Sequence, residues 1–334
     1  EDMQEKAAAF NVSDPRKWHD RVRLIPTVCM IRTALREFYE ADYAFIYEFS
    51  DDDISFAYRR LGYRNVLCGD VFVHHEGSTI SAAVPEQRAE NIEKGRALFR
   101  CKYNGIDAWS DVVNFEVYLR RALFEHAEMR ENASVLGIDV RCGTPLLEIR
   151  NTLRCDGFGN THLTAYTTDP KYWQDLSCFC EGGVFCGDID RLSHKLGDAL
   201  YDYIIIGEYG DLYEDALAVI RSAASHLRAG GALVCKLRNY DLPYELEAVA
   251  NALQTPPALL AQGMQRLEAE LRKLPYDIEI YPYMEEAYFL KENLFAQLRG
   301  MEAYQSSAHM REVFSEERFD ALMTQYAVVL RKRV

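Results

Sequence analysis

The side chains best suited to chemistry lie within residues 51–79. Asp51 and Asp53 belong to an acidic cluster that opens a predicted amphipathic helix, and a Gly-Tyr turn and an apolar strand follow before His74 and His75. Carboxylates can accept a proton from a sugar hydroxyl or bind a divalent cation, and Mn²⁺ also accepts imidazole. Because side chains alternate along a strand, at most one of the two histidines is expected to act. A simpler alternative is that the acids only cap the helix.

This order of motifs resembles the acceptor half of family-2 glycosyltransferases, which have the GT-A fold. Residues 26–32 (PTVCMIR) and 39–49 fit the buried strand and loop that precede the acidic motif in that family. The resemblance covers residues 10–82. It implies that Asp51 is the catalytic base, that Asp53 is its paired acid, and that Asp53 and His74 lie at a Mn²⁺ or Mg²⁺ ion. It also implies a sugar or glycan acceptor.

From residue 134 onward, short apolar runs alternate with helical patterns. Unbroken apolar strands that alternate with helices predict an α/β fold with a parallel sheet buried on both faces. Strands are expected at 135–140, 163–167, 184–186, 203–207 and 232–237, and helices at 146–153 and 217–227. Further on, we expect a helix with an apolar stripe at 260–274, a strand at 278–283, and an edge strand at 325–330.

This series resembles a Rossmann-like class I S-adenosylmethionine-dependent methyltransferase domain over residues 130–240, and the resemblance implies that the terminal strand completes the sheet. Residues 200–239 match the family's fourth strand, acidic loop, helix, Gly-Gly turn (229–231) and fifth strand. In the family the first strand ends in a Gly-rich loop. The corresponding residues 137–145 read GIDVRCGTP, in which only Gly143 matches a motif glycine. A side chain at a position where such a loop needs glycine strains the backbone and blocks the close approach of a ligand. The cofactor loop is therefore predicted to be degenerate, or eroded, relative to the family's loop.

If S-adenosylmethionine binds, the resemblance implies contacts from Gly143, Asp169, Asp188 and Glu208. Asp169 follows the second strand, and Asp188 precedes the loop that contacts adenine in the family. Glu208 follows the fourth strand, where related enzymes place groups that face the substrate. It could equally be a solvated loop charge.

Bulk properties limit the functional classes. A chain of 334 residues exceeds one ordinary domain, and the predicted parts are a glycosyltransferase-like segment (1–82), a helical connector (83–129) and a methyltransferase-like domain (130–334). The net charge of −14 argues against nucleic-acid binding, and no apolar run is long enough to span a membrane. Nine cysteines, with no standard zinc spacing, favour reduced thiols in a cytoplasmic protein. A homodimer would cover surface that a glycosyltransferase segment of this length leaves exposed.

The leading hypothesis from the sequence is the C-terminal part of a bacterial glycosyltransferase–methyltransferase fusion for surface glycan or polysaccharide assembly. In the family a preceding half holds the sugar nucleotide, and no strand-helix run in this chain replaces it. The alternative is a non-catalytic binding or scaffold module that retains the methyltransferase fold, which the eroded loop favours. A dehydrogenase is a weaker hypothesis because the motif GxGxxG is missing.

Overall fold

The computed structural model describes residues 3–25, 28–39, 42–45, 48–74, 85–238, 268–282, 300, 305–308, 311 and 325–333. Contacts divide the chain into two compact units. The first comprises Glu1–Phe115 with Met129–Asp188, and the second Glu116–Glu128 with Ile189–Val334. The domain boundaries expected from sequence, 1–82, 83–129 and 130–334, stay a prediction. No helix in the described part of the chain is long and apolar enough to cross a lipid bilayer.

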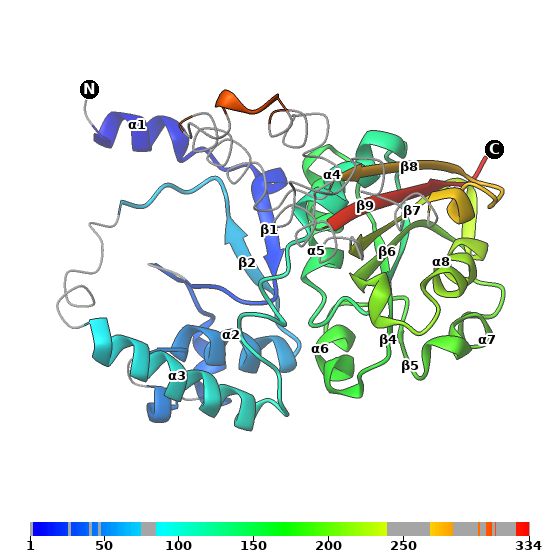
Figure 1. The fold of residues 1–334 in the computed structure, drawn as a ribbon. Coiled ribbons are helices and arrows are strands. Elements are labelled where there is room, and N and C mark those ends of the chain that lie inside the picture. Colours follow the sequence, from blue (N-terminus) through cyan, green and yellow to red (C-terminus); the bar gives the residue numbers. More distant parts are fainter. Residues whose placement is uncertain are drawn as a thin grey trace. The chain divides into compact units, whose positions relative to one another are not determined.

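The first unit combines a two-stranded sheet, a group of helices and three parallel strands (Figure 1). Strands β3, β4 and β5 lie in the order β5-β4-β3, and β1 pairs with β2 in antiparallel fashion. Helix α5 packs against β1 and β3. The elements are α1 (Met3–Phe10), β1 (Trp18–Arg21), α2 (Ser50–Arg60), β2 (Asn65–Cys68), α3 (Pro85–Lys102), β3 (Ser134–Ile138), α5 (Thr144–Cys155), β4 (His162–Thr167), α6 (Trp173–Ser177) and β5 (Val184–Cys186).

The second unit contains four strands in the order β6-β7-β9-β8. Strands β6 and β7 are parallel, whereas β9 is antiparallel to both of its neighbours, and α4 packs on β7 and β9 (Figure 1). The elements are α4 (Val117–His126), α7 (Leu192–Leu196), β6 (Tyr201–Tyr209), α8 (Ala216–Ser225), β7 (Leu227–Arg238), β8 (Asp277–Pro282) and β9 (Gln325–Arg331).

The strands behave as their sequences predict. Val135, Leu136 and Ile138 of β3 are fully buried, and β6 is buried from Tyr201 to Gly207. Such strands are stable only with both faces covered, which confirms the expected mixed α/β fold with parallel strands.

Two details of the second unit differ from expectation. The terminal strand was expected at an edge, but β9 pairs with β7 on one side and β8 on the other, and its residues 326–330 are buried. The Gly-Gly turn at 229–231 lies inside β7, where the register with β6 shifts between Leu227 and Ala232. Gly230 has φ +71°, and a Cβ on Gly231 would lie 2.8 Å from the Asp202 carbonyl oxygen. The glycines therefore form a bulge, because only they permit this backbone and this close approach.

The buried strand expected at 26–32 is wrong. Residues 28–32 form no strand, and the side chains of Val28 and Met30 are 67% and 100% exposed. An apolar run alone does not make a strand when no neighbouring strand pairs with it. Of the apolar stripe expected at 260–274, Leu271 and Leu274 are buried, and the part up to 267 lies outside the described residues.

A buried ion cluster connects α2 to α6. The Asp175 carboxylate, which is fully buried, accepts hydrogen bonds from Arg59 Nη2 at 2.5 Å and from Arg60 Nη2 at 2.6 Å. Arg59 Nη1 also donates to the Asp175 carbonyl oxygen at 3.2 Å. The helix of the expected glycosyltransferase-like segment is thus fixed to the β4–β5 connection by charged groups removed from water.

Replacing this carboxylate should destabilise the fold strongly. In Asp175→Ala the buried Arg59 and the partly buried Arg60 lose their counter-ion, and breaking a buried pair in this way typically costs about 3–5 kcal/mol. Urea unfolding measures the loss. Glu268→Ala, which removes the exposed partner of Arg272, is the control and should cost less than about 1 kcal/mol. Equal effects of the two variants would contradict this role of Asp175.

Candidate functional site

The loop after β3 keeps a left-handed backbone without the expected glycines. Asp139, Arg141 and Gly143 have φ values of 47°, 53° and 93°. The Asp139 Oδ1 atom accepts hydrogen bonds from the Thr168 N–H at 2.6 Å and the Thr168 hydroxyl at 3.0 Å. These bonds tie the end of β3 to the end of β4 and compensate for the strain that a non-glycine residue has in this conformation.

Other parts of the first unit surround the same loop. The Cys142 N–H donates to the Asp111 carbonyl oxygen at 3.2 Å, and the Thr144 hydroxyl donates to the Val112 carbonyl oxygen at 2.5 Å. A Cβ on Gly143 would lie 2.2 Å from Phe179 Cζ, so this glycine makes room for an aromatic ring. Burial raises the pKa of the Cys142 thiol well above its usual value.

The structure brings together four of the residues expected to bind a cofactor or to shape its loop. Because β3, β4 and β5 are parallel neighbours, their C-terminal ends lie side by side. The residues that follow these ends therefore lie close together: Asp139, Gly143, Asp169 and Asp188. Asp188 is exposed, and Asp169 is partly exposed. Asp169 Oδ1 accepts from the Lys171 N–H at 3.0 Å, and the Asp188 carbonyl oxygen accepts from the Tyr166 hydroxyl at 2.6 Å. Glu208 is half-buried at the end of β6, in the second unit.

Asp53 on α2 is occupied by cationic and phenolic partners. Its side chain is 1% exposed, and its carboxylate accepts from the Tyr103 hydroxyl at 2.6 Å and from Lys102 Nζ at 3.0 Å. Burial, and then the hydrogen bond to Asp53, raise the pKa of Tyr103. These contacts fix α2 to the end of α3, and this observed role of Asp53 is structural.

Asp52, between the two acids expected to act, has the most perturbed carboxyl group of the cluster. Burial raises its pKa to about 6, although Arg23 Nε lies 2.8 Å from Oδ1. Oδ1 forms no hydrogen bond, so desolvation outweighs the ion pair, and burial lowers the pKa of Arg23 for the same reason. Burial also raises the pKa of the half-buried Asp51. A carboxyl with a pKa near 6 can exchange protons close to neutral pH.

Asp52 was not among the residues expected to act, although the sequence contains a signal for it. Asp52 lies four residues before Phe56, which is fully buried, and residues at this spacing share a helix face. The helical period therefore places Asp52 on the inner face of α2.

The expected metal site receives no support from the structure. In the described part of the chain, no group of three or more His, Cys, Asp or Glu side chains could hold a metal ion. His74 is exposed, and His75 lies outside the described residues.

No protein-family model matches this chain, and no curated protein sequence matches it. Similar solved structures include a SAM-dependent methyltransferase from Archaeoglobus fulgidus, with 19% identity, a TM-score of 0.41, and coverage of 71% of this chain and 99% of that one. The plantazolicin methyltransferase BpumL, in complex with a triazolic desmethylPZN analog and SAH, has 16% identity, a TM-score of 0.38, and coverage of 66% and 83%. The [4+2]-cyclase SpnF has 16% identity, a TM-score of 0.39, and coverage of 68% and 83%. Similarities at this level assign no activity to the chain.

The raised pKa of Asp52 predicts a pH-dependent stability difference. The folded-state pKa of about 6 exceeds the unfolded value of about 3.9, so the folded chain binds this proton more tightly. The contribution of Asp52 to stability therefore falls as pH rises from about 4 to about 6. Asp52→Asn does not titrate, so its stability relative to the parent chain should rise by up to about 3 kcal/mol over this interval. Urea unfolding at both pH values measures the change, and Asp156→Asn, at an exposed position, is the control. A pH-independent difference for Asp52→Asn would contradict the assignment.

Two glycines with the same backbone conformation provide a matched test of packing at the loop. Gly143 has φ +93° and Gly157 has φ +92°, but a Cβ on Gly157 would meet no atom within 4 Å. Alanine at either position should cost about 1–2 kcal/mol from backbone strain. Gly143→Ala should cost about 1–3 kcal/mol more, because Phe179 must move. The difference is read from urea unfolding, and equal losses would mean that Phe179 does not fill the space beside Gly143.

Proposed function

We propose that this chain is a methyltransferase-like protein that binds S-adenosylmethionine at the C-terminal ends of β3, β4 and β5, which we call the cofactor edge. The observation that carries this proposal is the left-handed backbone at Asp139, Arg141 and Gly143. Strained conformations at non-glycine residues cost about 1–3 kcal/mol each and concentrate at functional sites. A loop that keeps this shape after its glycines have been replaced is consistent with a retained binding role.

The acids at this edge suit an adenosyl ligand. Carboxylates accept hydrogen bonds from ribose hydroxyls and from an exocyclic amine. The exposed Asp188 and the partly exposed Asp169 follow adjacent parallel strands. When bound, S-adenosylmethionine supplies a methyl group on a sulfonium centre. The contribution of this chain is to hold the adenosyl part through Asp169 and Asp188, while Asp139 positions the loop through Thr168.

A non-catalytic scaffold is the second candidate, and one observation favours it. Phe179 fills the space beside Gly143, and residues 111 and 112 hydrogen-bond across the loop, so the chain's own atoms occupy two sides of the Gly143 turn. This scaffold would keep the fold for a binding role that does not involve the cofactor.

The role in glycan assembly and the glycosyltransferase fusion form no part of this proposal. They stay hypotheses from the sequence resemblance, as do Asp51 as base, Glu208 as a cofactor contact, and a sugar or glycan acceptor. The paired state of Asp53 and the exposed residues 28–32 lend them no support.

Calorimetric titration of the full chain with S-adenosylmethionine and S-adenosylhomocysteine tests the proposal. We expect both ligands to bind, and at a hundred times the dissociation constant to stabilise the fold by about 2.7 kcal/mol. Asp169→Ala and Asp188→Ala should each weaken binding about tenfold, because each removes a charged hydrogen-bond acceptor. Asp156→Ala, an exposed acid at the end of α5, is the control and should leave binding unchanged. The absence of binding at millimolar ligand would reject the proposal and leave the scaffold.

A further inference from the structure

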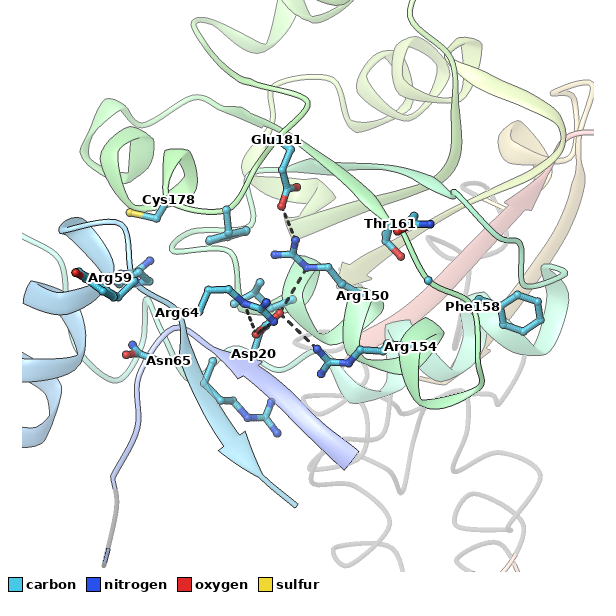
Figure 2. Close-up of a pocket in the computed structure, with 16 residues that line it drawn as sticks. Asp20, Arg59, Arg64, Asn65, Arg150, Arg154, Phe158, Thr161, Cys178 and Glu181 are labelled. Atoms are coloured by element: carbon cyan, nitrogen blue, oxygen red, sulfur yellow. Dashed lines mark hydrogen bonds and ion pairs between the residues drawn. The ribbon is translucent and has the colours of Figure 1, made fainter. Parts of the chain in front are cut away.

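A separate cavity of about 310 Å³ lies within the first unit (Figure 2). It runs along one side of α5 and is closed by β1, the α2–β2 turn and the segments that precede β4 and β5. Leu147, Phe158 and Phe179 give it an apolar wall. Its remaining lining contains five arginines but only two carboxylates, those of Asp20 and Glu181. An excess of cationic side chains is unexpected in a chain with a net charge of −14.

Three of these arginines converge on one carboxylate. Arg64 donates to Asp20 Oδ1 from Nη2 at 2.6 Å and from Nε at 3.0 Å. Arg150 Nε and Arg154 Nη1 lie 3.9 and 3.8 Å from Asp20 Oδ2, which is beyond hydrogen-bond range. Figure 2 shows the three guanidinium groups pointing toward Asp20 from α5 and from the segment ahead of β2. Glu181, which is half exposed, accepts from Arg150 Nη1 at 2.7 Å.

The cavity also holds donors that have no acceptor. The Nε atoms of Arg59, Arg150 and Arg154 are buried and form no hydrogen bond. Arg59 is 3% exposed, and its terminal nitrogens are already engaged by Asp175. Buried donors without an acceptor are destabilising, and guanidinium groups four residues apart on a helix repel each other. A bound anion would relieve the repulsion between Arg150 and Arg154.

Pairing with carboxylates does not remove the positive excess. Arg21 has its own partner in Glu148, and Arg59 shares Asp175 with Arg60. Two carboxylates are then left to balance three guanidinium groups. The carboxylates are those of Asp20 and the half-exposed Glu181, and the arginines are Arg64, Arg150 and Arg154. Guanidinium groups match phosphate oxygens through two parallel N–H···O bonds, a geometry that a single distant carboxylate does not offer here.

We propose that this cavity binds a small organic phosphate, with Arg150 and Arg154 on the phosphate group and the apolar wall on the organic part. Its volume is at the small end of ligand pockets, which suits a phosphomonoester better than a nucleotide. Asp20 holds the guanidinium groups together before the anion arrives and competes with it for them.

Phe179 lies beside both the cavity and the loop of the proposed cofactor site, but the polar groups of the two sites are separate. Thr161 and Glu181 line the cavity ahead of β4 and β5, whereas Asp169 and Asp188 follow the same strands. A strand of six residues rises about 20 Å, so the acceptors for the adenosyl ligand and the mouth of the arginine cavity lie at opposite ends of β4. The phosphate proposal therefore does not depend on S-adenosylmethionine binding.

Calorimetric titration of the full chain with inorganic phosphate and with phenyl phosphate tests the proposal. We expect both to bind, and phenyl phosphate to bind more tightly because its ring meets the apolar wall. Arg150→Gln and Arg154→Gln should each weaken binding about tenfold or more, since each removes a charge-assisted hydrogen-bond donor. Arg16→Gln, an exposed ion-paired arginine outside the cavity, should leave the affinity within about twofold.

Asp20→Asn separates a binding role from a purely structural one. Asparagine removes the competing negative charge and can still accept a hydrogen bond from Arg64, so phosphate should bind more tightly than to the parent chain. If the arginines serve only to hold Asp20, this variant will not bind phosphate more tightly. The proposal is overturned if neither probe binds the parent chain at millimolar concentration, or if Arg154→Gln binds as the parent does while melting at a similar temperature. Equal affinities for the two probes would overturn the organic part of the assignment.

Discussion

The first unit depends on a single buried carboxylate. Asp175 follows β4 and neutralises Arg59 and Arg60 on α2, so a segment more than a hundred residues earlier in the chain is held against the connection between two sheet strands. The same helix carries Asp53, which fixes the end of α3, and leads into the turn that places Arg64 at the cavity. Because these charges are largely removed from water, separating any of them from its partner is costly, and this cost helps to hold α2 in position.

The loop after β3 has left-handed backbone conformations although most of the expected glycines are absent. A Gly-rich loop adopts left-handed conformations without cost, whereas here Asp139 and Arg141 adopt them and the Asp139 carboxylate holds the turn through Thr168. Asparagine and aspartate tolerate this region of conformational space better than other non-glycine residues, which makes Asp139 the less strained of the two. The loop is therefore maintained by tertiary contacts, and a motif defined by glycines underestimates how far its geometry persists.

Local pattern predicted much of the fold, and long-range pairing accounts for what it missed. The strands β3, β4, β5 and β6 could be predicted because each is a short and mainly apolar run. The interior position of β9 and the exposure of residues 28–32 could not, since both depend on which distant strand is available as a partner. At the candidate sites, Asp169 and Asp188 were predicted from the family resemblance. The arginine cavity was not, because Asp20, Arg64 and Arg150 meet only in the folded unit.

The position of β9 also affects how this chain is made. Strand β7 pairs with β9 through residues 238 to 232 against 325 to 331, so its partner is synthesised roughly ninety residues later. At about 5–20 residues per second, the apolar edge of β7 is without that partner for about 5 to 18 seconds of translation. An unpaired strand edge of this kind can associate with other chains. Protection of nascent chains during this interval would therefore favour the folded second unit.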